Sequence, residues 1–172
     1  GEDHLNKIRG SLHETSLISF RSQLNFWHGN TKDALLDFQI IYIDKNETTK
    51  MSSYLDHLTL YALSIIIEGK SEKDSFKQDL EFCIRELAVY CELCQESYLH
   101  KYKLIEAELS REKNQRMEIV IDLYISAIEL ARDNQFIQYQ ALATERLASY
   151  CDTKNLTSVA KTYIKDAVDL YK

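Results

Sequence analysis

Cysteines are the first residues in this chain whose type and spacing could support chemistry. Cys91 and Cys94 form a C-x-x-C pair, while Cys83 and Cys151 stand apart from it. Structural zinc takes about four ligands, and neither a second C-x-x-C pair nor a zinc-finger pair of histidines is present. A thioredoxin-like pair would follow a strand, whereas this one falls in or at the end of an expected helix. Buried structural thiols, redox-active thiols at Cys91 and Cys94, or a metal site remain possible, and the surrounding apolar pattern favours the first.

A histidine and a lysine raise a second possibility, phosphoryl transfer. His100 precedes Lys103 by three residues, as at the phosphoacceptor of histidine phosphotransfer domains, where a small residue after the lysine keeps the imidazole accessible. Here Leu104 follows the lysine, so a phosphotransfer role for His100 is the least favoured hypothesis. Glu106 and Glu108, two residues apart, point in different directions on a helix and indicate solvated side chains. No glycine-rich phosphate loop occurs, and we therefore predict no catalytic residue, no metal and no cofactor.

Composition excludes several classes of partner. The chain has 172 residues, of which 45% are hydrophobic and 28% charged, as in an ordinary globular protein. The formal net charge is −6, and basic residues are interleaved with acidic ones, so no basic stripe could follow a nucleic acid backbone. No apolar run approaches the ~18–20 residues of a membrane span. With cysteines that need not pair, we expect a cytoplasmic protein that binds neither nucleic acid nor membrane.

Helix-breaking residues are scarce. Proline is absent, and no glycine follows Gly69. The chain can therefore form long helices and lacks the turn residues of an all-β fold. The predicted fold class is all-α, with about eight amphipathic helices in one domain at 13–172, a fragment of a larger protein, after a tail at 1–12. The expected helices are 13–28, 31–44, 52–68, 74–94, 97–113, 117–133, 136–151 and 156–171. The stripe expected to be buried on the first is Leu17, Phe20, Leu24 and Trp27.

The second half of the chain is periodic. Three asparagines, spaced by 20 and 21 residues, fall between expected helices at Asn114, Asn134 and Asn155. Asparagine tolerates the left-handed conformation, so each can end a helix and let the chain reverse. Four alanines keep nearly the same interval, at Ala107, Ala127, Ala148 and Ala167. Their small side chains would let crossing helices approach closely, although helix propensity alone is an alternative explanation.

One helix and one turn per interval give helical hairpins of about forty residues, the size of tetratricopeptide-like units. We therefore expect antiparallel hairpins stacked as a tetratricopeptide-like right-handed solenoid. Its first helices would line a concave surface, where polar and aromatic groups away from the apolar stripe could bind a partner, with ordinary solvated faces as the competing interpretation. The candidate partner-binding residues are Arg21, Asn25, His28, His57, Tyr61, Lys101, Glu108, Glu145 and Arg146.

Several segments resemble the helical-repeat region of large hybrid sensor histidine kinases. The similarity covers Tyr98–Ala167 and is carried by residues 100–109, 123–128, 131–138, 141–145 and 159–167. Residues 26–35 also resemble that region, and 54–63 do so more loosely. The chain departs from the family pattern at Asn155, where glycine is usual, and at Arg146, where an aliphatic residue is usual.

The resemblance implies a regulatory segment that contacts other proteins. In these bacterial and fungal kinases, a Ser/Thr-kinase-like domain and a signalling ATPase domain precede the repeats. Sensing, histidine-kinase and receiver domains follow them, and some of the proteins serve stress responses. The ATP site and phosphoacceptor would lie outside this chain, so the implied role is a non-catalytic interaction or signal-relay module in two-component signalling. A free-standing helical-repeat adaptor for a partner peptide or domain is the alternative.

Overall fold

All secondary structure in the described part of the protein is helical. This computed structural model describes residues 17–43 and 54–172. Residues 17–27 are helical. The helices that follow are α2 (Thr31–Ile43), α4 (Tyr54–Ile67), α5 (Asp74–Leu93), α6 (Gln95–Glu112), α7 (Met117–Asp133), α8 (Ile137–Thr153) and α9 (Thr157–Leu170). The all-α prediction is confirmed. The predicted tail, the start of the first helix and the turn after α2 lie outside the described residues.

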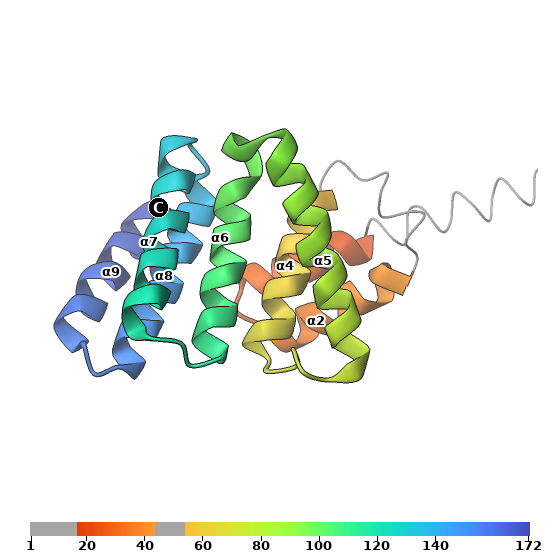
Figure 1. The fold of residues 1–172 in the computed structure, drawn as a ribbon, viewed down its shortest axis with the longest axis horizontal. Helices are drawn as coiled ribbons and strands as arrows, with labels where there is room; N and C mark the ends of the chain where they lie inside the picture. Colours follow the sequence, from red (N-terminus) through yellow and green to blue (C-terminus); the bar gives the residue numbers. More distant parts are fainter. Residues whose placement is uncertain (1–16, 44–53) are drawn as a thin grey trace, which may run out of the picture. The chain divides into compact units, whose positions relative to one another are not determined.

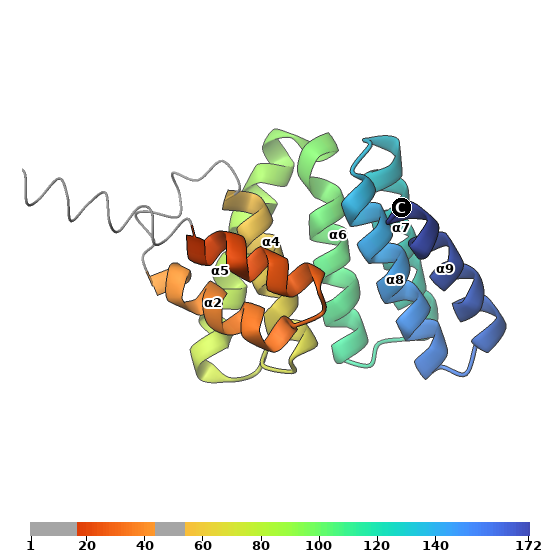
Figure 2. The ribbon, with the colours of Figure 1, turned by 180° about the vertical axis from the view of Figure 1, so that it is seen from behind.

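The chain divides into two compact units, Gly1–Cys83 and Ile84–Lys172, and α5 continues from one into the other. In the first unit, helix 17–27 and α2 form a hairpin, and α2 packs against α4 (Figure 2). Every residue of α4 from 57 to 66 is buried. A helix that is apolar on nearly all sides is stable only when protein surrounds it, and α4 is therefore the core helix of this unit.

In the second unit, α6, α7, α8 and α9 pack together, with α7 in front of α8 in the view of Figure 1. Each packs against the next, and α6 also contacts α8. All four periodic alanines are buried, one on each helix: Ala107, Ala127, Ala148 and Ala167. Helix propensity would be served equally well by an exposed alanine, so their shared burial favours the packing explanation.

Most hairpin turns share one hydrogen-bond pattern. In five of the described turns, one residue after the helix takes a positive φ, and the next backbone N–H donates to the carbonyl five residues earlier, as from Gln115 to Ser110 at 3.0 Å. This is the Schellman arrangement, which satisfies carbonyls left open at a helix end. The residues with positive φ in the described turns are Gly29, Gly69, Asn114, Gln135 and Asn155. The turn at Cys94, between α5 and α6, differs, with φ of −154°.

Two of the three predicted turn asparagines, Asn114 and Asn155, are confirmed in the left-handed conformation, and the third prediction was wrong by one position. Gln135 has φ of 63°, whereas Asn134 has φ of −103°. The side-chain amide of Asn134 instead donates to the Leu130 carbonyl at 2.9 Å. Asparagine therefore closes this helix through its side chain, and the following glutamine carries the backbone strain.

Replacing these two neighbours by glycine should have opposite effects on stability. Gln135→Gly removes the steric strain of a side chain at positive φ. Even with the entropic cost of glycine subtracted, it should raise the free energy of unfolding by about 0.5–1 kcal/mol. Asn134→Gly removes a cap from a residue with ordinary φ and should lower it by about 1 kcal/mol. Urea unfolding of both variants measures the difference. Equal effects of the two changes would contradict the observed turn geometry.

The apolar stripe predicted to be buried on the first helix was wrong for three of its four residues, and the fourth, Trp27, is half-buried. Leu17 and Phe20 are 71% and 65% exposed, and Leu24 is also exposed. The buried side of helix 17–27 carries Ser19, Ser22 and Phe26. Contacts with α2 accompany this orientation of the helix about its axis. Arg21 donates to both carboxylate oxygens of Asp37 at 2.6 and 2.8 Å, and Asn25 donates to one of them at 3.3 Å. Small serines permit close approach of the helix to the rest of the unit.

Candidate functional site

The predicted partner-binding residues of the first unit fall into two groups. Arg21, whose side chain is 61% exposed, and half-buried Asn25 both donate to Asp37, and His28 is exposed. The expected exposure of His57 and Tyr61 was wrong, because both are buried in α4. Tyr61 donates its hydroxyl to Asp79 at 2.7 Å. A core helix surrounded by protein has no solvated side on which a partner could be bound.

His57 is held as a neutral imidazole. Its ring meets that of Phe38 edge-on, with centroids 4.7 Å apart. Neither ring nitrogen forms a hydrogen bond within the described part of the chain. Removal from water lowers the pKa of His57 to about 4. At neutral pH it therefore acts as a core residue and carries no charge for a partner.

In the second unit, a buried polar network joins three helices. Glu108 of α6 is only 2% exposed, and Arg146 of α8 donates to both of its oxygens at 2.6 and 2.9 Å. Tyr124 of α7 donates its hydroxyl to the same carboxylate at 2.7 Å. A buried carboxylate is tolerated only with such partners. Burial, followed by the charge of Glu108, raises the pKa of Tyr124 far above its ordinary value.

These contacts correct two expectations. Glu108 does not face solvent, and Arg146, with a side chain 20% exposed, is mostly enclosed. The network therefore joins α8 to α6 and α7, and its main role is to stabilise the fold.

Lys101 was also expected on the surface and is instead buried. Its ammonium lies 5.5, 5.9 and 4.9 Å from the ring centroids of Tyr98, Phe136 and Tyr139. Three aromatic faces around a cation provide an electrostatic attraction that partly offsets its desolvation. Lys101 therefore lies in an aromatic cage made by its own unit.

His100, the candidate phosphoacceptor, is 1% exposed. Its ring stacks on Phe136 with centroids 4.3 Å apart and meets Tyr139 edge-on at 5.1 Å. Phosphoryl transfer from a receiver domain requires an imidazole that the partner can reach. The enclosed position of His100 therefore disfavours the phosphotransfer hypothesis.

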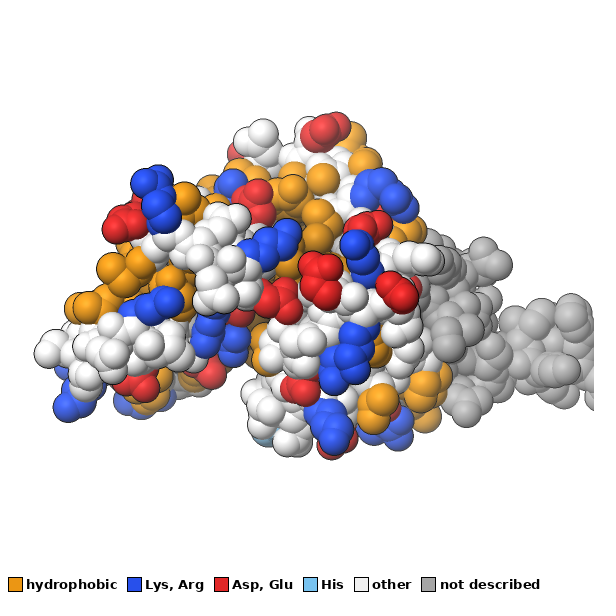
Figure 3. Space-filling model, turned by 60° about the horizontal axis from the view of Figure 1, so that its bottom comes forward, with side chains coloured by type: hydrophobic (Ala, Val, Ile, Leu, Met, Phe, Trp, Pro, Cys, Tyr) orange, Lys and Arg blue, Asp and Glu red, His pale blue; other side chains and the backbone are white. Residues whose placement is uncertain are grey.

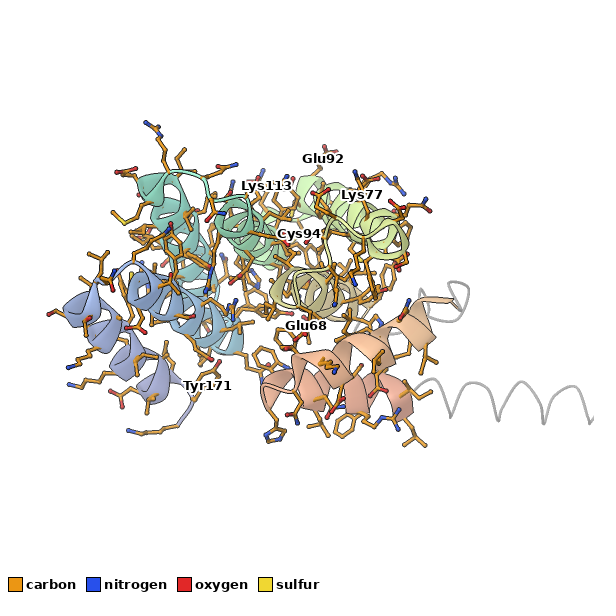
Figure 4. All side chains as sticks on the ribbon, turned by 90° about the horizontal axis from the view of Figure 1, so that it is seen from below. Glu68, Lys77, Glu92, Cys94, Lys113 and Tyr171 are labelled. Atoms are coloured by element: carbon orange, nitrogen blue, oxygen red, sulfur yellow. The ribbon has the colours of Figure 1, made fainter. Side chains whose placement is uncertain are left out.

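None of the four cysteines forms a disulfide. Cys83, Cys91 and Cys151 are buried, and burial, followed by the nearby Glu106 carboxylate, raises the pKa of Cys91. Cys94 is half-buried between α5 and α6 and lies 3.2 Å from the Ser97 hydroxyl (Figure 4). Raised thiol pKa values disfavour the reactive thiolate. Among the described residues, no group of three or more histidine, cysteine, aspartate or glutamate side chains has the arrangement of a metal site.

A groove of about 410 Å³ lies on α7, α8 and α9. Since α8 packs against both neighbours, it forms the middle of the groove. The lining residues are Ile128 and Arg132 of α7, Gln140 and Thr144 of α8, and Tyr163, Asp166, Asp169 and Leu170 of α9. None of them was predicted as a site residue, because the groove needs three helices whose mutual packing the sequence does not show. The predicted residue Glu145 of α8 is exposed and accepts a hydrogen bond from Tyr171, labelled in Figure 4, at 3.0 Å.

A second surface feature lies on the hairpin of the first unit. Five large apolar side chains there are exposed, and we call them the hairpin face: Leu17, Phe20, Leu24, Leu36 and Ile40. They occupy the sides of helix 17–27 and α2 that are opposite to the buried residues. Large apolar side chains exposed on two neighbouring helices make this hairpin a candidate surface for binding another protein.

Charges of both signs are interleaved over the face of the molecule in Figure 3. No described helix combines the length and apolar character needed to cross a membrane. Comparison with known family models, curated proteins and solved structures finds no match to this chain.

Proposed function

We propose that this chain is a non-catalytic helical-repeat module that binds another folded protein through the hairpin face and relays a signal in a hybrid histidine kinase. The observation that carries the proposal is an inverted polarity in the hairpin. Helix 17–27 buries Ser19 and Ser22, while it exposes Leu17 and Phe20. Ordinary surface helices do the opposite.

The second hairpin helix buries an apolar side, with Leu35 and Ile41 among its residues, and carries further apolar residues on its exposed side. Asp37 of α2 is buried, whereas Leu36 and Ile40 are 53% and 52% exposed. Helical spacing places these two side chains on one side of α2, opposite Ala34 and Phe38 in the core. Burying such apolar groups against a partner contributes about 25 cal/mol of binding free energy per Å² of buried area and therefore favours association.

Three further features support the finer parts of the proposal. Serial packing of α6–α9, the buried alanines and the repeated turn geometry support a tetratricopeptide-like right-handed solenoid. The resemblance of Tyr98–Ala167 to sensor-kinase repeats supports membership of a two-component kinase with a role in stress signalling. Four cysteines without a disulfide support a reducing, cytoplasmic location. The reading frame of the full-length protein distinguishes this kinase from a free-standing adaptor.

Replacing the hairpin face by polar residues should abolish partner binding without unfolding the protein. The variant is Leu17→Ser, Phe20→Ser and Leu24→Ser, and the matched control is Val159→Ser, Ile164→Ser and Val168→Ser, three exposed apolar residues of α9. With the chain as bait and the isolated sensing and receiver domains of its parent protein as prey, wild type and control should retain a domain that the hairpin variant loses at least about tenfold. Circular dichroism should show both variants folded.

Equal retention by the hairpin variant would reject this face as the contact. If wild type retains no domain at all, and its addition leaves kinase autophosphorylation unchanged, the relay function is wrong.

A further inference from the structure

We propose that the groove on α7, α8 and α9 binds a basic peptide segment in which an aliphatic side chain lies beside lysine or arginine. This site belongs to the second unit and is separate from the hairpin face. Its volume of about 410 Å³ is in the range of ligand sites, about 300–1,000 Å³. It can therefore hold a few residues of a partner.

The apolar part of the groove favours an aliphatic anchor. Ile128, Tyr163 and Leu170 are half-buried and line it from both outer helices. A side chain placed on them would complete their removal from water. Each buried methylene contributes about 0.8 kcal/mol, so one leucine-sized anchor adds substantially to affinity.

The charged part of the groove favours a cation. Arg132 is already bound to Asp133 at 3.1 Å, and Asp169 to Lys172 at 2.8 Å. Asp166 is exposed and forms no ion pair within the described residues. The lining itself holds one cation, Arg132, and two carboxylates, Asp166 and Asp169, so its formal charge is −1 beside the apolar surface. A lysine or arginine would complement it, whereas a phosphate or an acidic peptide would be repelled.

The openness of the site favours a peptide over a compact small molecule. Arg132, Asp166 and Asp169 are exposed, so a bound ligand would keep one side in solvent. Sites for small molecules enclose about 70–90% of the ligand surface. Gln140 in the middle of the groove adds a side-chain amide that can donate to and accept from a peptide backbone.

The test uses the full chain and fluorescein-labelled hexapeptides. An alternating lysine–leucine peptide should bind, a glutamate–leucine peptide should not, and a lysine–serine peptide should bind at least about tenfold more weakly for lack of the anchor. Asp166→Asn should raise the Kd for the lysine–leucine peptide about fivefold to tenfold at low salt, and added salt should reduce that difference. Asp152→Asn, an exposed change on α8 outside the groove, should leave the Kd unchanged.

A filling variant gives an independent check. Gln140→Trp should abolish binding of the lysine–leucine peptide, while the hairpin-face triple variant should bind it normally. Equal binding of the lysine–leucine and glutamate–leucine peptides, or equal effects of Asp166→Asn and Asp152→Asn, would overturn the proposal. Because the hairpin-face variant is included, failure of the groove does not imply failure of the proposed function.

Discussion

Arg146→Met is expected to lower the free energy of unfolding by about 3–5 kcal/mol. The substitution keeps an unbranched side chain of similar reach but removes both hydrogen bonds to Glu108, at 2.6 and 2.9 Å. Glu108 is 2% exposed, so its carboxylate would remain in the interior with only the Tyr124 hydroxyl as a donor. Leaving a buried charge without its counter-ion is among the most destabilising single changes.

Urea unfolding followed by circular dichroism measures this effect, and two variants control it. Arg132→Met makes the same substitution at the ion pair with Asp133, whose side chains are 57% and 65% exposed, and should cost less than about 1 kcal/mol. The double variant Glu108→Leu with Arg146→Met removes both charges and should recover most of the loss. If Arg146→Met cost no more than Arg132→Met, the buried pair would not hold α6 and α8 together.

Stability is expected to fall by on the order of 3 kcal/mol between pH 7 and pH 4 because of His57. In the unfolded chain its imidazole takes up a proton near pH 6.5, whereas in the folded protein burial lowers its pKa to about 4. Between these values the unfolded state binds more protons. The free energy of unfolding therefore decreases as pH falls through this window, and the contribution is constant above it.

His57→Leu should remove this dependence, since leucine has similar volume and no proton to bind. At pH 7 the variant should be as stable as wild type or more stable, because neither ring nitrogen has a hydrogen bond to lose in the described residues. The measurement is urea unfolding at half-unit steps from pH 7 to pH 4. His28→Leu, at an exposed position, is the control and should follow wild type. Parallel curves for wild type and His57→Leu would show that the buried imidazole does not set the acid sensitivity.

The candidate site could be predicted only in part from the sequence, and the reasons are specific. The rule that polar residues off the apolar stripe face solvent was correct for Arg21, His28 and Glu145, which are exposed. It was wrong for His57, Lys101 and Glu108, because a helix enclosed on several sides has no solvated stripe. Leu17 and Phe20 were wrongly placed in the core, since helical spacing shows that a face is apolar but not whether it packs on its own chain or on another.

Local physics within single helices was determined by the sequence itself. The scarcity of proline and glycine and the 3.6-residue spacing of apolar residues predicted the ends of the helices. From α5 onward, the predicted ends lie within about two residues of the observed ones. Left-handed asparagines at Asn114 and Asn155 followed from the same local preferences. Only the tertiary structure decided which face each helix buries. It also decided that Glu108 pairs with Arg146, 38 residues away, and that α7, α8 and α9 form a groove. These features depend on contacts between distant segments, whose energies exceed the small local preferences that a sequence pattern expresses.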